Sequence, residues 1–195
     1  RAIVCLNARD RNVLGFHRDL LTMITYGLTD VLLVFGDRPS RGTRSGSLTV
    51  RQMLSEYREM LDGTSDWPAA LRVGVTTRLI PLPSWKSQAD FLFVQVSFSL
   101  DELIQWRRSI TFDGPVYAGV LVPASLGMIE RLQRVVTDLI VPKSWMSAIA
   151  EDQSAGVRLA CDLLLAIRDC GMFDGVHLIP VSRYRDVATL LDGQV

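Results

Sequence analysis

Cysteine and histidine are scarce in this sequence, and their scarcity excludes several kinds of site. The 195 residues include three cysteines and two histidines. The cysteine number is odd and there is no Cys-x-x-Cys pair, so the sequence indicates neither a disulfide framework nor a thiolate zinc site. The two histidines lack the spacing of metal ligands, and we expect no metal. This cysteine usage fits a reducing cytoplasm.

An excess of one charge and a long apolar run are also missing. Lys plus Arg equals Asp plus Glu at 21 each, so no long-range field favours nucleic acid or an anionic membrane. No apolar run approaches the ~18 residues of a membrane span, and the first residues do not show the charged, apolar and small-residue order of a signal peptide. We therefore expect a soluble cytoplasmic protein that binds neither nucleic acid nor a membrane.

Apolar segments of strand length alternate with segments of helical period along the chain. This alternation predicts repeated βα units around a parallel sheet. The strand-length segments are apolar almost without interruption, as a strand covered on both faces requires. The predicted strands are 2–7, 30–36, 71–77, 90–96, 116–122 and 175–181. The predicted helices are 9–26, 50–61, 100–110, 126–140, 156–170 and 183–191, with Thr49 and Ser99 as N-caps and Gly171 as a stop signal.

Two connections differ from an ordinary βα repeat. Residues 78–89 contain two prolines and leave little room for a full crossover helix between two predicted strands. Residues 38–47 carry three arginines and two glycines, a polar composition that could close over a ligand. A solvated loop is the plainer alternative for these arginines, Arg38, Arg41 and Arg44.

Two turns at the ends of predicted strands resemble those of a known enzyme family. The first is Arg-Asp-Arg-Asn at 9–12, and the second is Gly-Asp-Arg-Pro at 36–39. With the helix between them, they resemble the third strand, third helix and fourth strand of the methylenetetrahydrofolate reductase family. A carboxylate at the carboxyl end of an apolar strand also lies on the face where α/β barrels carry out chemistry.

The resemblance extends over the rest of the chain with uneven strength. The segment 90–98 resembles the family's sixth strand through Gln95 and Phe98, and 115–121 resembles the seventh through Gly119. Residues 175–178 resemble the eighth strand, with His177 and Arg183 as the matching residues.

The resemblance implies an α/β fold of the (βα)8 TIM-barrel type. Because 195 residues are fewer than the roughly 250 typical of this barrel, we expect strands three to eight in a single partial catalytic domain over 1–195, without the first two βα units. The implied activity is that of a cytoplasmic flavoprotein oxidoreductase of one-carbon metabolism and methionine biosynthesis. Such an enzyme reduces 5,10-methylenetetrahydrofolate to 5-methyltetrahydrofolate with NAD(P)H via FAD.

The resemblance also implies roles for individual residues. Asp37 is the catalytic candidate, because a carboxylate stabilises the iminium cation that develops when the methylene bridge opens. Gln95 and Leu126 are the substrate-binding candidates, and the Gln95 amide offers both a donor and an acceptor to a pterin edge. The cofactor-binding candidates are Cys5, Phe35, Gly36, Asp37, Arg78 and Lys86.

Some family positions hold other residues in this chain. Cys5 replaces a histidine of the family and Arg78 replaces a tyrosine. The family's glutamate on strand one, which donates a proton to the folate, has no counterpart among these residues. General-acid catalysis, which typically raises the reaction rate by 10²- to 10⁴-fold, is therefore not assigned to any residue of this chain.

Each assignment has a plainer alternative. Asp37 could be a turn-forming residue, Gln95 could satisfy backbone groups at a strand end, and Cys5 could be a small buried apolar residue. The chain as a whole could be a flavin-free folate- or pterin-binding barrel that acts as a non-catalytic subunit, or an unrelated barrel enzyme. Six strands also leave two sheet edges, so a homo-oligomer or a partner that completes the barrel is a further expectation.

Overall fold

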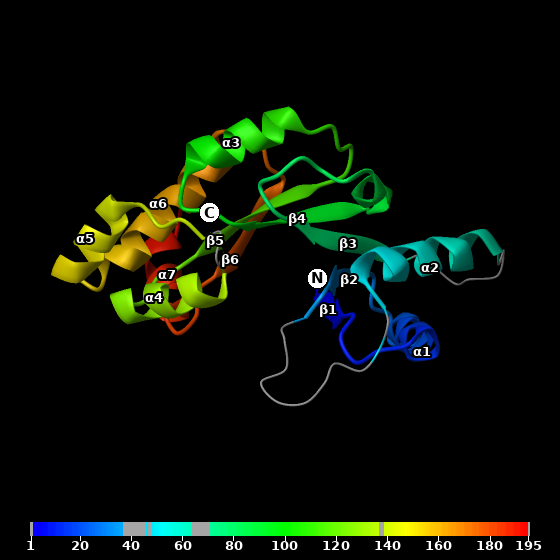
Figure 1. Ribbon diagram of the computed structural model, residues 1–195. Coiled ribbons are helices and arrows are strands. Elements are labelled where there is room, and N and C mark those ends of the chain that lie inside the picture. The colour runs from blue at the N-terminus through cyan, green and yellow to red at the C-terminus, as the bar shows by residue number, and fades with distance from the viewer. Residues whose placement is uncertain (1, 37–45, 47, 64–70, 137–138, 195) are drawn as a thin grey trace. The chain divides into compact units, whose positions relative to one another are not determined.

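A computed structural model describes residues 2–36, 46, 48–63, 71–136 and 139–194 (Figure 1). Its strands follow one another in the sheet in chain order. The pairs β1–β2, β2–β3 and β5–β6 are parallel. The strands are β1 (Ile3–Asn7), β2 (Asp30–Val34), β3 (Arg72–Thr77), β4 (Phe91–Val96), β5 (Val116–Leu121) and β6 (Gly175–Ile179). The predicted α/β class with a parallel sheet is confirmed.

Helices follow most of the strands. They are α1 (Val13–Thr25), α2 (Val50–Gly63), the 3-10 helix η1 (Ser84–Gln88), α3 (Leu100–Ser109), α4 (Leu126–Val135), α5 (Lys143–Glu151), α6 (Ala155–Asp169) and α7 (Tyr184–Leu191). Along the described part of the chain, none of these is long and apolar enough to cross a membrane.

The predicted element boundaries hold closely for the strands and less well for the helices. Each predicted strand is present and is shorter by one or two residues. The helix predicted from residue 9 begins at Val13, because Asn12 is its N-cap and accepts a hydrogen bond from the Gly15 amide at 2.8 Å. The helix predicted over 126–140 ends at Val135, and α5 was not predicted. The connection 78–89 contains only η1, as the prolines indicate.

The chain divides into two compact units, which are described separately. The first unit comprises Arg1–Thr77, Leu82–Leu92 and Phe112–Gly114, and the second comprises Arg78–Pro81, Phe93–Thr111 and Pro115–Val195. The single partial-barrel domain that the sequence predicts over 1–195 stays a prediction.

In the first unit, helices pack on the sheet through apolar faces. Phe16, Leu20 and Met23 follow the helical period on α1 and are buried. On α2, the fully buried Tyr57 donates a hydrogen bond from its hydroxyl to the Leu71 carbonyl at 2.5 Å. The next residue, Arg58, donates to the Gln88 carbonyl at 2.9 Å and to Asp90 at 2.8 Å. These bonds attach α2 to the connections on either side of β3.

Aspartates at the amino ends of strands bind the start of the neighbouring strand. Asp90 precedes β4, and its carboxylate accepts from the Val73 amide at 2.6 Å while its own amide donates to the Val73 carbonyl at 2.8 Å. Asp174 precedes β6 and makes the same pair of bonds with Val116, at 2.8 and 3.0 Å. Asp30, 1% exposed at the start of β2, pairs with Arg72 of β3 at 2.9 Å. These contacts stabilise the register of the parallel strands.

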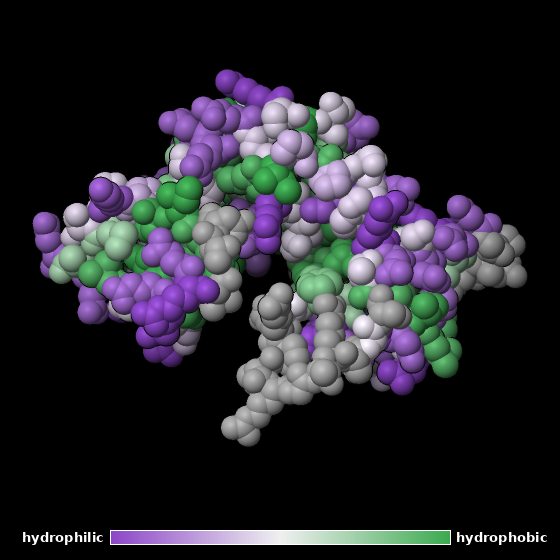
Figure 2. All heavy atoms as spheres, viewed as in Figure 1, coloured by the Kyte–Doolittle hydropathy of each residue, from purple (hydrophilic) through white to green (hydrophobic). Residues whose placement is uncertain are grey.

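The second unit has its core between its strands and α3, α5 and α6. Val116, Ala118 and Val120 of β5 are fully buried. The Phe98 ring packs edge-on against Trp145 of α5, with 5.0 Å between ring centres. Gly156 in the first turn of α6 has no room for a side chain, because a Cβ there would overlap the Pro123 carbonyl. Hydrophilic residues cover the outer side of α3, at the top of the view in Figure 2.

Burial of the Tyr57 hydroxyl generates a prediction about stability and pH. Desolvation raises the pKa of Tyr57 to about 12, above its ordinary value near 10. Because the pKa is raised in the folded state, the phenol makes its full contribution to the free energy of unfolding below pH ~10. This contribution is lost as the pH rises toward 12. We expect Tyr57→Phe to lower the unfolding free energy by about 1 kcal/mol at pH 8, and this deficit to shrink above pH ~10.

Urea unfolding of both proteins between pH 8 and 11.5 measures this deficit. Tyr26→Phe is the matched control, because Tyr26 is 79% exposed in the same unit and should show no deficit at any pH. A Tyr57→Phe deficit that stays constant across the pH range would contradict the raised pKa of the buried phenol.

Candidate functional site

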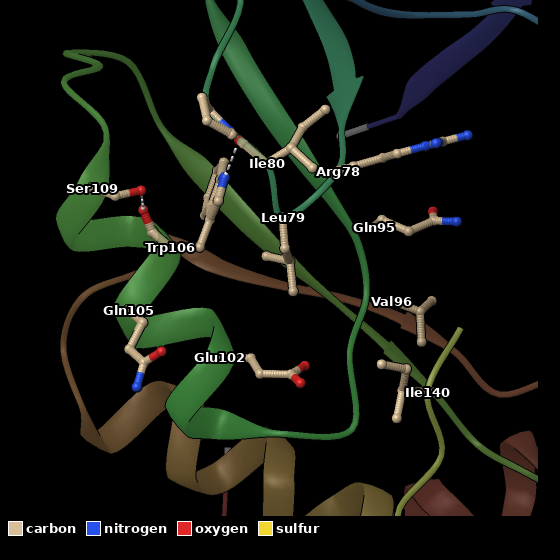
Figure 3. A pocket seen from close by; sticks show the side chains of 11 residues that line it. Arg78, Leu79, Ile80, Gln95, Val96, Glu102, Gln105, Trp106, Ser109 and Ile140 are labelled. Atoms are coloured by element: carbon tan, nitrogen blue, oxygen red, sulfur yellow. Dashed lines mark hydrogen bonds between the residues drawn. The ribbon is translucent and has the colours of Figure 1, made fainter. Parts of the chain in front are cut away.

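The second unit contains a cavity of about 500 Å³ beside the carboxyl end of β4 (Figure 3). This volume lies within the roughly 300–1,000 Å³ of small-molecule sites. Polar and apolar side chains from β4, α3 and the chain that follows β3 line it. They are Arg78, Leu79, Ile80, Pro81, Gln95, Val96, Glu102, Gln105, Trp106, Ser109 and Ile140.

One hydrogen bond attaches the chain after β3 to α3. The buried Trp106 donates from its indole Nε1 to the Ile80 carbonyl at 2.8 Å, and the Ser109 hydroxyl donates to the Trp106 carbonyl at 2.7 Å (Figure 3). Pro81 cannot donate to a helix or a ladder. Residues 78–81 form no regular helix or strand; the chain bends at Leu79 and Ile80, and these four residues form one wall of the cavity.

Gln95 is the polar exception on an apolar strand. The first four residues of β4 are buried, and Gln95, the fifth, is exposed near its carboxyl end. Polar side chains of a covered parallel strand are tolerated at its ends, where water or a ligand can satisfy them. In Figure 3 the Gln95 and Arg78 side chains extend in the same direction from neighbouring parts of the site.

Glu102 lies in the first turn of α3 and points from that helix into the cavity (Figure 3). The N-cap Ser99 accepts from the Glu102 amide at 3.3 Å. The Ser97 hydroxyl, just after β4, donates to Glu102 Oε2 at 3.1 Å. The carboxylate is thus held at the junction of β4 and α3.

The lining combines charged groups with apolar walls. Arg78 supplies a guanidinium, Glu102 a carboxylate, and Gln95 an amide that both donates and accepts. The Ile140 side chain is 71% exposed and forms part of the apolar wall. A planar heterocycle with a polar edge and an anionic substituent matches this set of groups.

The structure brings together two of the predicted site residues. Arg78 was predicted to bind the cofactor and Gln95 to bind the substrate, and both line this cavity. Leu126 is the first residue of α4 and lies outside the described lining, so its substrate contact stays a prediction. Asp37 and the three arginines at positions 38, 41 and 44 lie outside the described residues.

The other predicted cofactor residues lie in the first unit. Gly36 follows β2 with a φ of 82°, and a Cβ there would stand 3.2 Å from Cβ of Arg9, so this turn favours glycine. Phe35 is 49% exposed. Lys86 lies on η1 with its ammonium 5.4 Å from the centre of the Trp85 ring. Cys5 is exposed on β1, so its alternative as a buried apolar residue is wrong.

The predicted strand 175–181 was expected to be covered on both faces, and at His177 this expectation is wrong. This residue is exposed on β6, and its ring packs edge-on against Phe93 with 5.0 Å between centres. Tyr117 of β5 lies at the same distance from Phe93. Partial desolvation lowers the pKa of His177, which keeps this imidazole neutral at neutral pH.

Sequence reasoning did not predict Glu102 or Trp106 as part of the site. Glu102 carried a signal, because Ser99-x-x-Glu102 is a capping-box pattern that fixes the start of a helix. That pattern does not show that the carboxylate borders a cavity. Trp106 is buried at 5% exposure.

The Trp106 anchor generates a prediction. Trp106→Phe removes the donor to the Ile80 carbonyl, and loss of a typical hydrogen bond costs about 0.5–1.5 kcal/mol. We expect the unfolding free energy to fall by that amount and the amides of residues 78–80 to exchange about tenfold faster with solvent. Trp145→Phe is the control, since Trp145 packs on Phe98 in the same unit. Equal exchange of residues 78–80 in both variants would contradict the anchoring role.

Comparisons with known proteins do not assign a family. No protein-family model matches the chain, and no curated protein is similar enough to count as a match. Among solved structures, a chain of the tryptophan synthase α2β2 complex from the hyperthermophile Pyrococcus furiosus is 14% identical. The match covers 83% of this chain and 95% of the other, with a TM-score of 0.25. At this score it has no bearing on function.

Proposed function

We propose that this chain is a methylenetetrahydrofolate reductase-like flavoprotein, which reduces 5,10-methylenetetrahydrofolate to 5-methyltetrahydrofolate with NAD(P)H via FAD. One observation carries the proposal. The family resemblance suggested Arg78 for cofactor binding and Gln95 for substrate binding, and both residues line the same cavity. In this proposal the six strands correspond to strands three to eight of a (βα)8 barrel. The cytoplasmic location and a partner or second copy that completes the barrel stay predictions.

The proposed roles follow from the chemistry of each side chain. Gln95 hydrogen-bonds the pterin edge, because its amide offers a donor and an acceptor. Asp37 stabilises the cation that develops at the methylene carbon when the folate bridge opens. Arg78 binds a phosphate or carboxylate through charge-assisted hydrogen bonds.

The described groups fit the heterocyclic parts of these ligands better than the phosphates of FAD. Apolar side chains and amides of the lining suit a ring system, but Arg78 is the single cation among the lining residues of this cavity. Lys86 and the arginines at positions 38, 41 and 44 supply further cations in the proposal. A bound flavin would accept a hydride from the nicotinamide and deliver it to the methylene carbon.

A second candidate function is a flavin-free folate-binding protein. The connection between β3 and β4 favours it, because this connection contains only the five-residue η1 where the family has a helix that contacts flavin. In this alternative Gln95 and the cavity still bind a pterin, and the chain serves as a non-catalytic subunit.

A visible spectrum of the purified full chain distinguishes the two functions. A reductase should carry a bound flavin that absorbs in the visible range. Adding methylenetetrahydrofolate should reoxidise that flavin after photoreduction. A colourless protein that binds folate would support the alternative, and a colourless protein without folate binding would exclude both.

Substitution of Gln95 tests its contact with the pterin. Gln95→Ala removes both hydrogen-bonding groups, and we expect affinity for 5-methyltetrahydrofolate to fall about tenfold, equivalent to ~1.4 kcal/mol. Equilibrium titration measures this loss. Gln153→Ala, at an exposed position of the same unit, should bind as the unmodified chain does. Unchanged affinity in Gln95→Ala would remove Gln95 from the site.

A further inference from the structure

We propose that Glu102 is a specificity-determining residue of this cavity, whose carboxylate accepts the paired N–H donors of a 2-amino-4-oxopyrimidine ring. The ring is that of a pterin, so the inference rests on the proposed function and adds a residue to which the family resemblance gives no role. It also states which ring system the cavity accepts and which it rejects.

The carboxylate is available to a ligand although it accepts a hydrogen bond from the Ser97 hydroxyl. Glu102 is exposed and borders the cavity. An ionised carboxylate offers about four lone-pair sites, and the Ser97 hydroxyl uses one of them at 3.1 Å. Acceptor capacity therefore remains on the cavity side, while the bond to Ser97 restrains the direction of the group.

Glu102 and Gln95 both line the cavity, and the short segment that joins their elements contains Ser97. Ser97, which binds Glu102, lies two residues beyond Gln95 along the same chain direction. Because Gln95 and Glu102 both line the cavity, one bicyclic heterocycle is placed with the Gln95 amide at one part and the Glu102 carboxylate at another.

The hydrogen-bonding pattern of the ring decides whether Glu102 attracts or repels it. The pyrimidine edge of a pterin presents a ring N–H beside an exocyclic amino group, so two parallel donors face outward. A carboxylate accepts two parallel donors well, as it does from arginine. A pyrimidinedione edge, as in lumazine or in the flavin ring, has an N–H between two carbonyls. Its carbonyl oxygens would face the carboxylate and leave acceptors unpaired. Glu102 thus favours a pterin over a flavin ring here.

A purely structural role for Glu102 makes a different prediction. Acidic residues in a first helical turn stabilise the helix, and Glu or Gln serves equally in a capping box. Glu102→Gln therefore keeps the hydrogen bond from Ser97 and the start of α3, while it removes the charge and one acceptor. The variant should unfold at nearly the same urea concentration as the unmodified chain.

The test compares two ligands that differ at one ring substituent. Pterin-6-carboxylate has an amino group where lumazine-6-carboxylate has a carbonyl oxygen, and both carry the same anionic group, so the contribution of Arg78 cancels. We measure their dissociation constants by fluorescence titration with the unmodified full chain, Glu102→Gln and Glu130→Gln. Glu130 is exposed on α4 and does not line the cavity.

We expect the unmodified chain and Glu130→Gln to prefer the pterin by about 10- to 100-fold, the size of one or two charge-assisted hydrogen bonds. Glu102→Gln should reduce this preference to about threefold or less. Equal affinity for the two ligands in the unmodified chain, binding of neither, or a preference that survives in Glu102→Gln would overturn the proposal.

These outcomes are separate from the test of the proposed reductase. A yellow protein that reoxidises with methylenetetrahydrofolate but does not discriminate the two ligands would retain the proposed function and reject the role of Glu102. A colourless protein whose pterin preference is lost in Glu102→Gln would retain that role and reject the flavin-dependent reaction.

Discussion

The repeated bond between an aspartate that precedes one strand and the start of the neighbouring, earlier strand is the interaction that orders this sheet. Asp90 and Asp174 each form two bonds with the first part of a neighbouring strand, through the carboxylate and through the backbone. A shift of one residue would break both bonds and would turn every apolar side chain to the other face. The charged groups at the amino ends thereby serve stability, and the carboxyl ends remain for binding, as in other parallel α/β proteins.

The cavity follows from how the chain leaves two such strands. Between β3 and β4 the chain has no α-helix, and the Trp106 indole holds the Ile80 carbonyl against α3. After β4 the turn is tight, so Ser97 contacts Glu102 in the first turn of α3. Gln95, the penultimate residue of β4, completes the polar lining. The carboxyl end of a strand and the first turn of a helix therefore form the site, and they place an amide and a carboxylate on a rigid support.

Resemblance and tertiary structure contributed different residues to the site. Arg78 and Gln95 were predictable from the family resemblance, because Arg78 stands at the position of a family tyrosine and Gln95 matches a family residue on a predicted strand. Glu102 was not, because the helical period predicts only that such a residue is solvated, and its contact with Ser97 depends on the turn after β4. His177 was misplaced for a similar reason: the apolar residues around it indicate a covered strand, yet β6 is the last strand in the sheet order, and His177 on it is exposed.

The sequence by itself determined the α/β class, the strands and most helices, because continuous apolar runs, helical period and N-caps are local signals that tertiary contacts here reinforce. It also determined that the connection after β3 is short, since proline excludes a regular helix. Only the tertiary structure decided which polar side chains share a cavity. That outcome depends on the direction in which the chain turns after each strand, and no local pattern of residues records the direction.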